Sequence, residues 1–321
     1  MNMIDVIIPV YNPDEKLKKL LRGLYGQSVR ANRIILIWTV PGGKDSTLTD
    51  SGEYISCYGD ASAVDTVFIE KKDFDHGGTR AYAASLSDAE YMLFMTQDAV
   101  PDDDKLIASL LKMFDNKNVA AAYARQLPAE DATITEKIIR DFNYPDYERV
   151  QNSDTFSCYG IKTYFCSDVC AMYEKKYYDE AGGFVKRTIF NEDMIMAASL
   201  VKLGYTVMYT PQARVVHSHH YTYMEQYRRN FDLAVSQKEH PEVFEEVPSE
   251  GEGIKMVITV AKKLVKAGKI YKIPDLMIES AFKYMGYRKG KKFEKLSNKK
   301  IMKCTMSRLY WRNKEDTDKD N

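Results

Sequence analysis

The sequence contains no apolar run of about 18 residues, the length that an α-helix needs to span a bilayer. Its N-terminus, MNMIDVIIPVYN, has neither the basic start nor the cleavage site of a secretory signal peptide, and no internal repeat is visible. These absences favour a folded protein of the cytosol. A chain of 321 residues is long enough for one large α/β domain with an appendage, or for two ordinary domains.

Cysteine is scarce as well. Five cysteines are an odd number at low density, which favours reduced thiols over a disulfide framework. Cys158, Cys166 and Cys170 form the one cluster, and a structural zinc site is one interpretation of it. Zinc needs a fourth ligand and usually a closer pair of cysteines, so buried free thiols are the favoured interpretation.

Net charge is zero over the whole sequence, but it is very unevenly distributed. Residues 254–312 carry 17 Lys or Arg against three acidic residues, a net charge of +14. Residues 1–253 carry −12 and the last nine residues carry −2. We therefore expect chemically different regions: an α/β domain at 1–235, a basic helical region at 236–312 and a disordered acidic tail at 313–321.

Buried strands alternate with amphipathic helices in the α/β region. Leucines between Leu17 and Leu24 recur at steps of three and four residues, which predicts the first helix. An irregular segment is expected at 128–163. Such alternation with short loops is typical of a parallel, doubly wound sheet. Strands are predicted at 6–10, 33–40, 66–71, 91–98, 119–127 and 206–216, and further helices at 79–88, 103–114 and from Glu192 to the C-cap glycine Gly204.

Carboxylates occur at two positions where ligands often bind, after a buried strand and at the start of a helix. Asp98 follows the apolar run Tyr91–Met95, and the carboxyl ends of such strands are where α/β sheets hold ligands. Glu192 and Asp193 begin a helix. Asp98 is either a metal ligand or a turn residue, and the Glu192–Asp193 pair is either catalytic or a favourable charge at a helix N-terminus.

Histidines and glycines mark two further positions. His217 and His219 follow the last strand and point to one face of an extended chain, so at most these two can approach one ion together. In DFDHGGTR, residues 73–80, the glycines permit close approach of the backbone to a ligand and Arg80 supplies a positive charge. That segment either cradles a diphosphate or is a solvated turn.

The order of these features resembles the family 2 glycosyltransferases of the GT-A fold. The resemblance rests on DVIIPVYN, the strand ending in Asp98, GGF followed by NEDM, and the histidine after the next strand, and it covers about residues 3–235. HGGTR, TQDAVP, NEDM and HSH look most like the bacterial rhamnosyltransferase group. The resemblance implies a Rossmann-like, mostly parallel sheet flanked by helices, with the basic helical region appended.

The resemblance also implies a role for each matching residue. Asp98 and His217, with His219 as the alternative histidine, would hold Mn²⁺ or Mg²⁺, and Asp193, beside Glu192, would deprotonate the acceptor hydroxyl. Thr96 departs from the family pattern, because it stands where the first aspartate of the metal-binding D-x-D is expected. The residues expected to bind the donor are Pro9, Val10, Tyr11, Asn12, Asp45, His76, Gly77, Gly78, Arg80, Thr96 and Gln97.

The implied reaction is transfer of a sugar from a nucleotide diphosphate to a hydroxyl, with inversion and with help from a divalent metal. The subgroup implies dTDP-L-rhamnose as donor and a glycan or polyprenyl-linked glycan as acceptor, in the synthesis of bacterial surface polysaccharide. A non-catalytic sugar-nucleotide or glycan-binding module on the same scaffold is the alternative, and Thr96 keeps it open.

The basic region at 254–312 indicates where in the cell the protein could act. It interleaves Ile, Met, Val and Leu with Lys, a pattern that suits peripheral contact with the anionic inner face of a cell membrane. A helical cap with solvated lysines is the alternative. Nucleic acid is not expected as a partner, because no RNA- or DNA-binding motif accompanies the charge.

Overall fold

A computed structural model describes residues 3–40, 51–245 and 250–312. Asp45 and the predicted acidic tail at 313–321 lie outside the described residues. Contacts divide the chain into two units. The sheet unit draws on residues 1–129, 144–186 and 192–217, and the helical unit draws on 130–143, 187–191 and 218–321. The predicted domain at 1–235 thus includes the whole sheet unit and part of the helical unit, and its extent as a catalytic domain stays a prediction.

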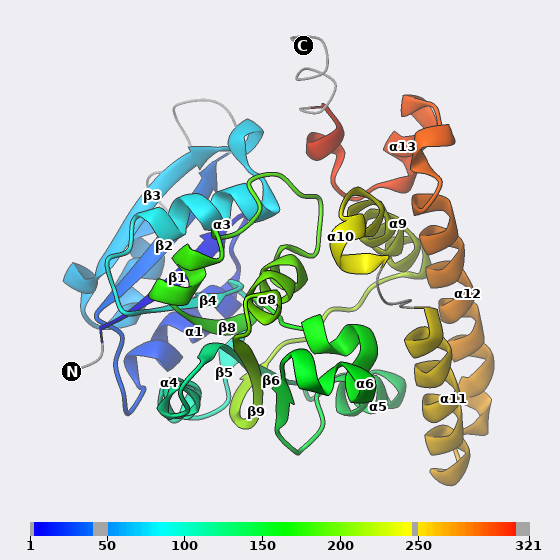
Figure 1. Cartoon of the computed structure of the whole chain (residues 1–321), viewed down its shortest axis with the longest axis horizontal. Coiled ribbons are helices and arrows are strands. Elements are labelled where there is room, and N and C mark those ends of the chain that lie inside the picture. Colours follow the sequence, from blue (N-terminus) through cyan, green and yellow to red (C-terminus); the bar gives the residue numbers. More distant parts are fainter. Residues whose placement is uncertain (1–2, 41–50, 246–249, 313–321) are drawn as a thin grey trace. The chain divides into compact units, whose positions relative to one another are not determined.

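The sheet unit contains a single curled sheet in the order β3-β2-β1-β4-β8-β6-β9-β5, with β7 also paired to β9 (Figure 1). The predicted parallel arrangement holds for β1 to β4 and for β6 with β9. It is wrong for β8, which pairs antiparallel with both β4 and β6, and for β5 and β7. The strands are β1 Ile4–Val10, β2 Arg33–Val40, β3 Val64–Glu70, β4 Tyr91–Met95, β5 Val100–Pro101, β6 Val119–Leu127, β7 Arg149–Gln151, β8 Cys170–Glu174 and β9 Thr206–Val216.

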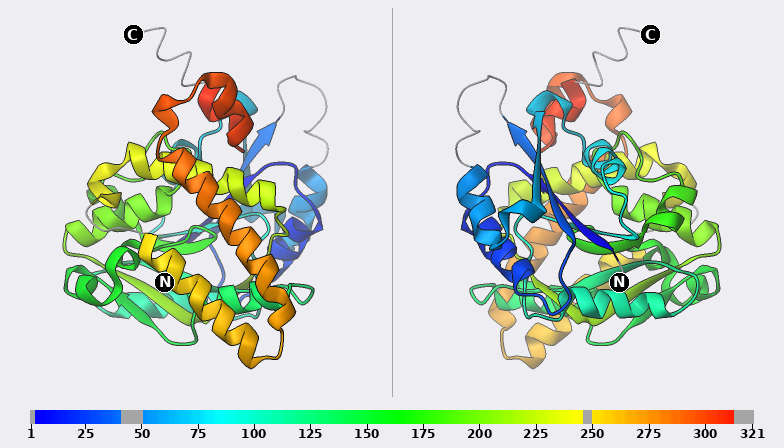
Figure 2. Two further views of the ribbon diagram at one scale, coloured as in Figure 1. Left: turned by 90° about the vertical axis from the view of Figure 1, so that its right-hand side faces the viewer. Right: turned by 90° about the vertical axis from the view of Figure 1, so that its left-hand side faces the viewer.

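Helices cover both faces of the sheet. In α1 the leucine stripe packs against the face that carries Val6 and Ile8, while Ile7 and Ile35 point to the other face, because side chains alternate along a strand. Figures 1 and 2 show α3 across the sheet from α1. The helices of the sheet unit are α1 Glu15–Tyr25, α2 Ser51–Ile55, α3 His76–Ser85, α4 Leu106–Leu111, α6 Phe156–Tyr159, α7 Lys175–Glu180 and α8 Glu192–Lys202.

Several predicted boundaries need correction. The strand before Asp98 ends at Met95, since a turn begins at Thr96. The helix predicted at 79–88 begins at His76, because the Asp75 side chain accepts hydrogen bonds from the backbone of Gly77 and Gly78 and caps it. The segment predicted as irregular contains α5, Ile134–Asn143, together with α6 and β7.

The helical unit confirms the predicted helical character of the C-terminal region. Two helices, α9 and α12, cross in close contact (Figure 2). Glycines make this contact feasible: a Cβ on Gly286 would overlap the Tyr227 carbonyl, and one on Gly290 would overlap that of Phe231. No helix of the described residues is long and apolar enough to cross a membrane. Besides α5, the helices of this unit are α9 Tyr223–Glu239, α10 Pro241–Phe244, α11 Glu250–Lys266, α12 Ile273–Gly290 and α13 Asn298–Cys304.

Candidate active site

One edge of the sheet gathers the residues that the sequence singled out. The strands β1, β4, β6 and β9 run in one direction, so their carboxyl ends meet at one edge. Because β8 runs the opposite way, its first residue, Cys170, lies at that same edge, opposite Met95. Loops after β1 and β4, the end of β6, the exit of β9 and the approach to β8 therefore converge.

Tyr11 and Gln97, both predicted to bind the donor, are joined directly. The side-chain amide of Gln97 accepts a hydrogen bond from the Tyr11 backbone N–H (2.8 Å) and donates one to the Tyr11 carbonyl (2.9 Å). The next residue, Asn12, adopts a left-handed conformation with φ of 45°. The Lys71 ammonium lies over the Tyr11 ring and donates to its hydroxyl. Gln97 thus fixes the backbone of the loop that follows Pro9 and Val10.

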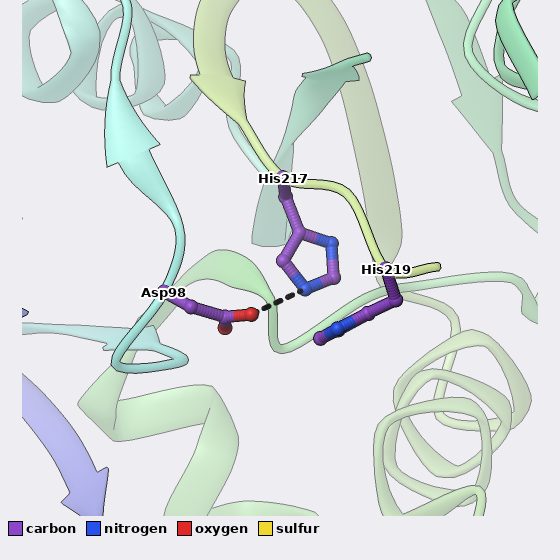
Figure 3. Close-up of side chains that lie close together, drawn as sticks. All are labelled: Asp98, His217 and His219. Carbon is purple, nitrogen blue, oxygen red and sulfur yellow. Dashed lines mark ion pairs between the residues drawn. The ribbon is translucent and has the colours of Figure 1, made fainter. Parts of the chain in front are cut away.

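Asp98 and His217 face one another, as Figure 3 shows: His217 Nε2 lies 3.5 Å from Asp98 Oδ2. His217 is buried and Asp98 is partly exposed. Asp98 and His217 thus present a carboxylate oxygen and an imidazole nitrogen that could hold a metal ion. Because His219 belongs by its contacts to the helical unit, the geometry of the site rests on Asp98 and His217.

A buried glutamine, Gln126, adjoins His217. Gln126 Oε1 lies 3.1 Å from His217 Nδ1. The amide nitrogen of Gln126 donates to the Tyr144 hydroxyl (2.6 Å) and to Ser167 Oγ (2.9 Å). His217 is therefore held on the side away from Asp98 by a network of hydrogen bonds.

Three consecutive residues before β8 connect the parts of the site. Ser167 contacts Gln126, as described above. The Asp168 N–H donates to Asp193 Oδ2 (3.4 Å), and the Val169 carbonyl accepts from the Thr96 backbone N–H (3.2 Å). The turn of Asp98, the support of His217 and the carboxylate of Asp193 thus share one short segment.

Arg80 lies in the interior, among carboxylates. Its side chain is 8% exposed, with Nη1 2.9 Å from Glu192 Oε1 and Nε 3.6 Å from Asp168 Oδ2. Asp168 also accepts a hydrogen bond from the Tyr173 hydroxyl (2.7 Å). Glu192 and Asp168 are both buried, so Arg80 compensates their charge in a region from which water is largely excluded.

Asp193 differs from its neighbour Glu192, because it stays partly exposed. Burial, followed by the negative charge of Glu192, raises the pKa of Asp193 to about 7. Backbone N–H groups of Met194 and Asp168 and the charge of Arg80 act in the opposite direction. A carboxylate with this pKa is a stronger base than an ordinary aspartate and is still substantially ionised near neutral pH.

Comparison with known proteins places the chain in a family. Residues 5–182 match the model of Glycosyl transferase family 2. The chain is a family 2 glycosyltransferase. It is 33% identical to the O-antigen chain rhamnosyltransferase RfbN of Salmonella typhimurium, covering 97% of this chain and 96% of that one. It is 31% identical to the O-antigen chain rhamnosyltransferase WbaN of Salmonella anatum, covering 98% and 97%.

Solved structures confirm the GT-A fold of this glycosyltransferase. The mannosyltransferase PcManGT from Pyrobaculum calidifontis superposes with a TM-score of 0.64 at 14% identity, over 91% of this chain and 88% of that one. TarS of S. aureus, residues 1–349 with UDP, gives a TM-score of 0.51 at 12% identity, over 91% of both chains.

Gly78 and His76, which were also predicted to bind the donor, have internal contacts in the glycosyltransferase. A Cβ on Gly78 would lie 2.5 Å from the Lys186 carbonyl oxygen, so this glycine accommodates the protein's own backbone. The His76 carbonyl accepts a hydrogen bond from Arg80. Binding of a diphosphate by this segment stays a prediction.

The five cysteines of the glycosyltransferase are all free thiols. Cys166 and Cys170 are buried, as predicted, whereas Cys158 is exposed. Cys166 contacts the Tyr173 hydroxyl at 3.5 Å and so borders the network of Asp168.

Gln126, Ser167 and Asp168 were missed by the sequence reasoning. A weak signal existed: Gln126 is a polar residue near the end of an otherwise apolar strand, VAAAYARQL, and Ser167 and Asp168 precede a buried strand. Position alone does not reveal which loops meet, because β8 enters the sheet from the opposite direction.

Proposed function

We propose that this glycosyltransferase transfers L-rhamnose from dTDP-L-rhamnose to a hydroxyl of a glycan or polyprenyl-linked glycan during synthesis of a bacterial surface polysaccharide. The names of RfbN and WbaN, O-antigen chain rhamnosyltransferases that align over nearly their whole length, support the sugar and the pathway. We further propose that the transfer requires Mn²⁺ or Mg²⁺ and inverts the anomeric centre.

The observation that carries the proposal is the facing pair of Asp98 and His217. A carboxylate oxygen and an imidazole nitrogen 3.5 Å apart fit a shared cation, and this donor set suits Mn²⁺. PcManGT was solved in complex with GDP-mannose and Mn²⁺, which makes Mn²⁺ the first ion to test. When bound, the ion would offset the negative charge that grows on the departing diphosphate.

In this reaction Asp193 acts as the general base. The acceptor oxygen forms a bond to the anomeric carbon as the bond from that carbon to the diphosphate oxygen breaks, and the hydroxyl proton passes to Asp193. Hydrogen bonds from Met194 and Asp168 orient the carboxylate. Asp193 suits this role better than Glu192, because Glu192 is buried against Arg80.

A donor panel tests the proposal. Purified protein is incubated with dTDP-L-rhamnose, UDP- and GDP-sugars, each with Mn²⁺, Mg²⁺ or EDTA, and nucleotide release is measured with and without a glycan acceptor. We expect acceptor-dependent release of dTDP that EDTA abolishes, and a product of inverted configuration by NMR. Asp193→Asn should lose at least about 10²-fold in turnover while still binding dTDP.

The same panel discriminates between the proposal and its alternative. Release from another donor would overturn the choice of rhamnose. Donor binding without any release, in the presence of an acceptor, would favour a non-catalytic binding module on the GT-A scaffold. Release that persists in EDTA would remove the metal from the proposal.

We also propose that the helical unit contacts an anionic membrane surface. Apolar side chains of α11 and of the turn before α12 are exposed, among them Ile254, Ile258, Ile270 and Tyr271. Lys269 and Lys272 flank the Tyr271 ring, and residues 254–312 carry a net charge of +14. Basic side chains around exposed apolar ones suit an interface with anionic lipid, where a polyprenyl-linked acceptor would be presented.

Vesicle sedimentation tests the membrane contact. We expect the full-length protein to bind vesicles containing phosphatidylglycerol, to bind less at high NaCl, and to bind less when Ile254, Ile258 and Ile270 are changed to Ser. Changing the exposed Ser62, Ser85 and Ser157 of the sheet unit to Ala is the control and should have no effect. Equal binding to neutral and anionic vesicles, or none to either, would contradict the proposal.

A further inference from the structure

Gln126 is buried and lies at the end of β6, opposite the exit of β9. Its side-chain Oε1 contacts His217 Nδ1 at 3.1 Å, and its Nε2 donates to the Tyr144 hydroxyl and to Ser167 Oγ. All of these residues belong to the sheet unit. The amide of this buried residue therefore contacts His217 directly.

The orientation of the Gln126 amide, with its oxygen or its nitrogen toward His217, determines which ring nitrogen of His217 carries the proton. The amide oxygen faces His217 Nδ1, and the amide nitrogen faces the hydroxyl groups of Tyr144 and Ser167, which can accept from it. An imidazole nitrogen that receives a carbonyl oxygen must carry a proton. From this network we assign the Nδ1–H tautomer to His217, with Gln126 Oε1 as acceptor.

The assignment determines what His217 presents to Asp98. With the proton on Nδ1, the neutral ring directs the lone pair of Nε2 toward the side on which Asp98 Oδ2 lies, 3.5 Å away. Two electron-pair donors that face each other at this distance repel unless a cation lies between them. Protein histidines that bind metals typically donate their second N–H to a fixed acceptor, which orients the ring.

We propose that Gln126 is a positioning residue that fixes the tautomer and ring orientation of His217 and so prepares the Asp98–His217 pair for a divalent cation. This inference rests on the proposed metal dependence and names a residue outside the ligand set. Without Gln126, His217 is free to place its proton on Nε2 and donate it to Asp98, which closes the site to a metal.

Two variants separate the acceptor role from simple packing. Gln126→Leu keeps the approximate size and removes the acceptor. Gln126→Glu keeps an oxygen for His217 Nδ1–H, and the hydroxyls of Tyr144 and Ser167 can donate to its other oxygen. Tyr144→Phe is the matched control, since it removes one hydroxyl of the network and leaves the contact between Gln126 and His217 in place.

Two measurements test the inference on the full-length protein. First, Mn²⁺ affinity is measured by EPR in saturating dTDP, where we expect Gln126→Leu to bind about 10- to 100-fold more weakly than wild type. Gln126→Glu and Tyr144→Phe should stay close to wild type. Second, the ¹⁵N shifts of His217 in metal-free protein should report Nδ1–H in wild type and a shift toward Nε2–H in Gln126→Leu.

The outcomes distinguish this inference from the proposed function. If wild type binds no Mn²⁺, the metal dependence fails, and the NMR measurement still decides the tautomer. If wild type binds Mn²⁺ and Gln126→Leu binds it equally well, the positioning role fails alone. An Nε2–H tautomer in metal-free wild type would also overturn it. A folding failure of Gln126→Leu leaves the wild-type tautomer and the behaviour of Gln126→Glu as tests.

Discussion

Arg80 Nη1 lies 2.9 Å from Glu192 Oε1, and both side chains are more than nine-tenths buried. The pair joins the second turn of α3 to the first turn of α8, two helices more than a hundred residues apart in sequence. It also brings positive charge close to Asp168 and Asp193. Since these carboxylates outnumber the guanidinium, Arg80 is the residue on which the charge balance of the site depends.

Replacing Arg80 with Met should destabilise the protein by about 3 to 5 kcal/mol, because buried carboxylates lose their partner. The decrease in the free energy of unfolding should be larger near pH 8 than near pH 5.5. Without Arg80 the carboxyl groups have higher pKa values in the native state, so ionising them at the higher pH destabilises the native state further. Urea unfolding at the two pH values measures this. Lys112→Met, at an exposed position, is the control, and a pH-independent loss would contradict the electrostatic explanation.

The residues that the sequence identified share one property: each follows a strand or begins a helix. Asp98, Asp193 and His217 could be found in this way, because the chemistry of such positions is visible in local pattern. Contacts between residues far apart in the sequence could not be found in this way. Contact of Arg80 with a diphosphate stays a prediction, while its pairing with Glu192 was not expected, because no local pattern indicates which carboxylate a buried arginine meets.

The direction of β8 explains most of the other contacts of the site that the sequence did not predict. An apolar run predicts a buried strand but not its direction, since periodicity is the same either way. Its antiparallel entry brings Ser167 and Asp168 to the edge where Asp98 and His217 lie. The functional surroundings of predicted ligands therefore depend on topology, which the sequence pattern leaves open.

The rate of transfer should rise with pH and level off above about pH 7. Asp193 must be ionised to accept the hydroxyl proton, and burial raises its pKa to about 7. The same raised pKa means that the native state holds this proton more tightly than the unfolded state, so this group lowers stability as pH rises from about 4 to 7. A pH profile of kcat at saturating donor and acceptor measures the ascending limb. A profile that is flat between about pH 5.5 and 8 would exclude Asp193 as the titrating base.

Gln97→Ala should weaken donor binding by about tenfold, because the loop after β1 loses both hydrogen bonds that fix the Tyr11 backbone. We expect the effect mainly in the KM for the nucleotide sugar and in the affinity for dTDP, measured by calorimetry. Gln97→Glu should not restore binding, since its carboxylate meets the Tyr11 carbonyl oxygen. Gln212→Ala, an exposed glutamine of β9, is the control; unchanged dTDP affinity in Gln97→Ala would show that the loop keeps its conformation unaided.

Because α9 and α12 pack closely, we expect glycine substitutions in the helical unit to change its stability in different directions. Gly286→Ala places a methyl group against the Tyr227 carbonyl, so the helices must separate, at a cost of about 1 to 3 kcal/mol or more. Gly253→Ala is the matched control: this glycine lies in α11 with open space around its Cβ position, and the same substitution should stabilise the helix by up to about 1 kcal/mol. Urea unfolding of the full-length variants measures both changes. If Gly286→Ala lowers the free energy of unfolding and Gly253→Ala raises it, the contact between the helices, rather than helix propensity, decides the effect at Gly286. If Gly286→Ala stabilises the protein, α9 and α12 do not approach as closely as their glycines indicate.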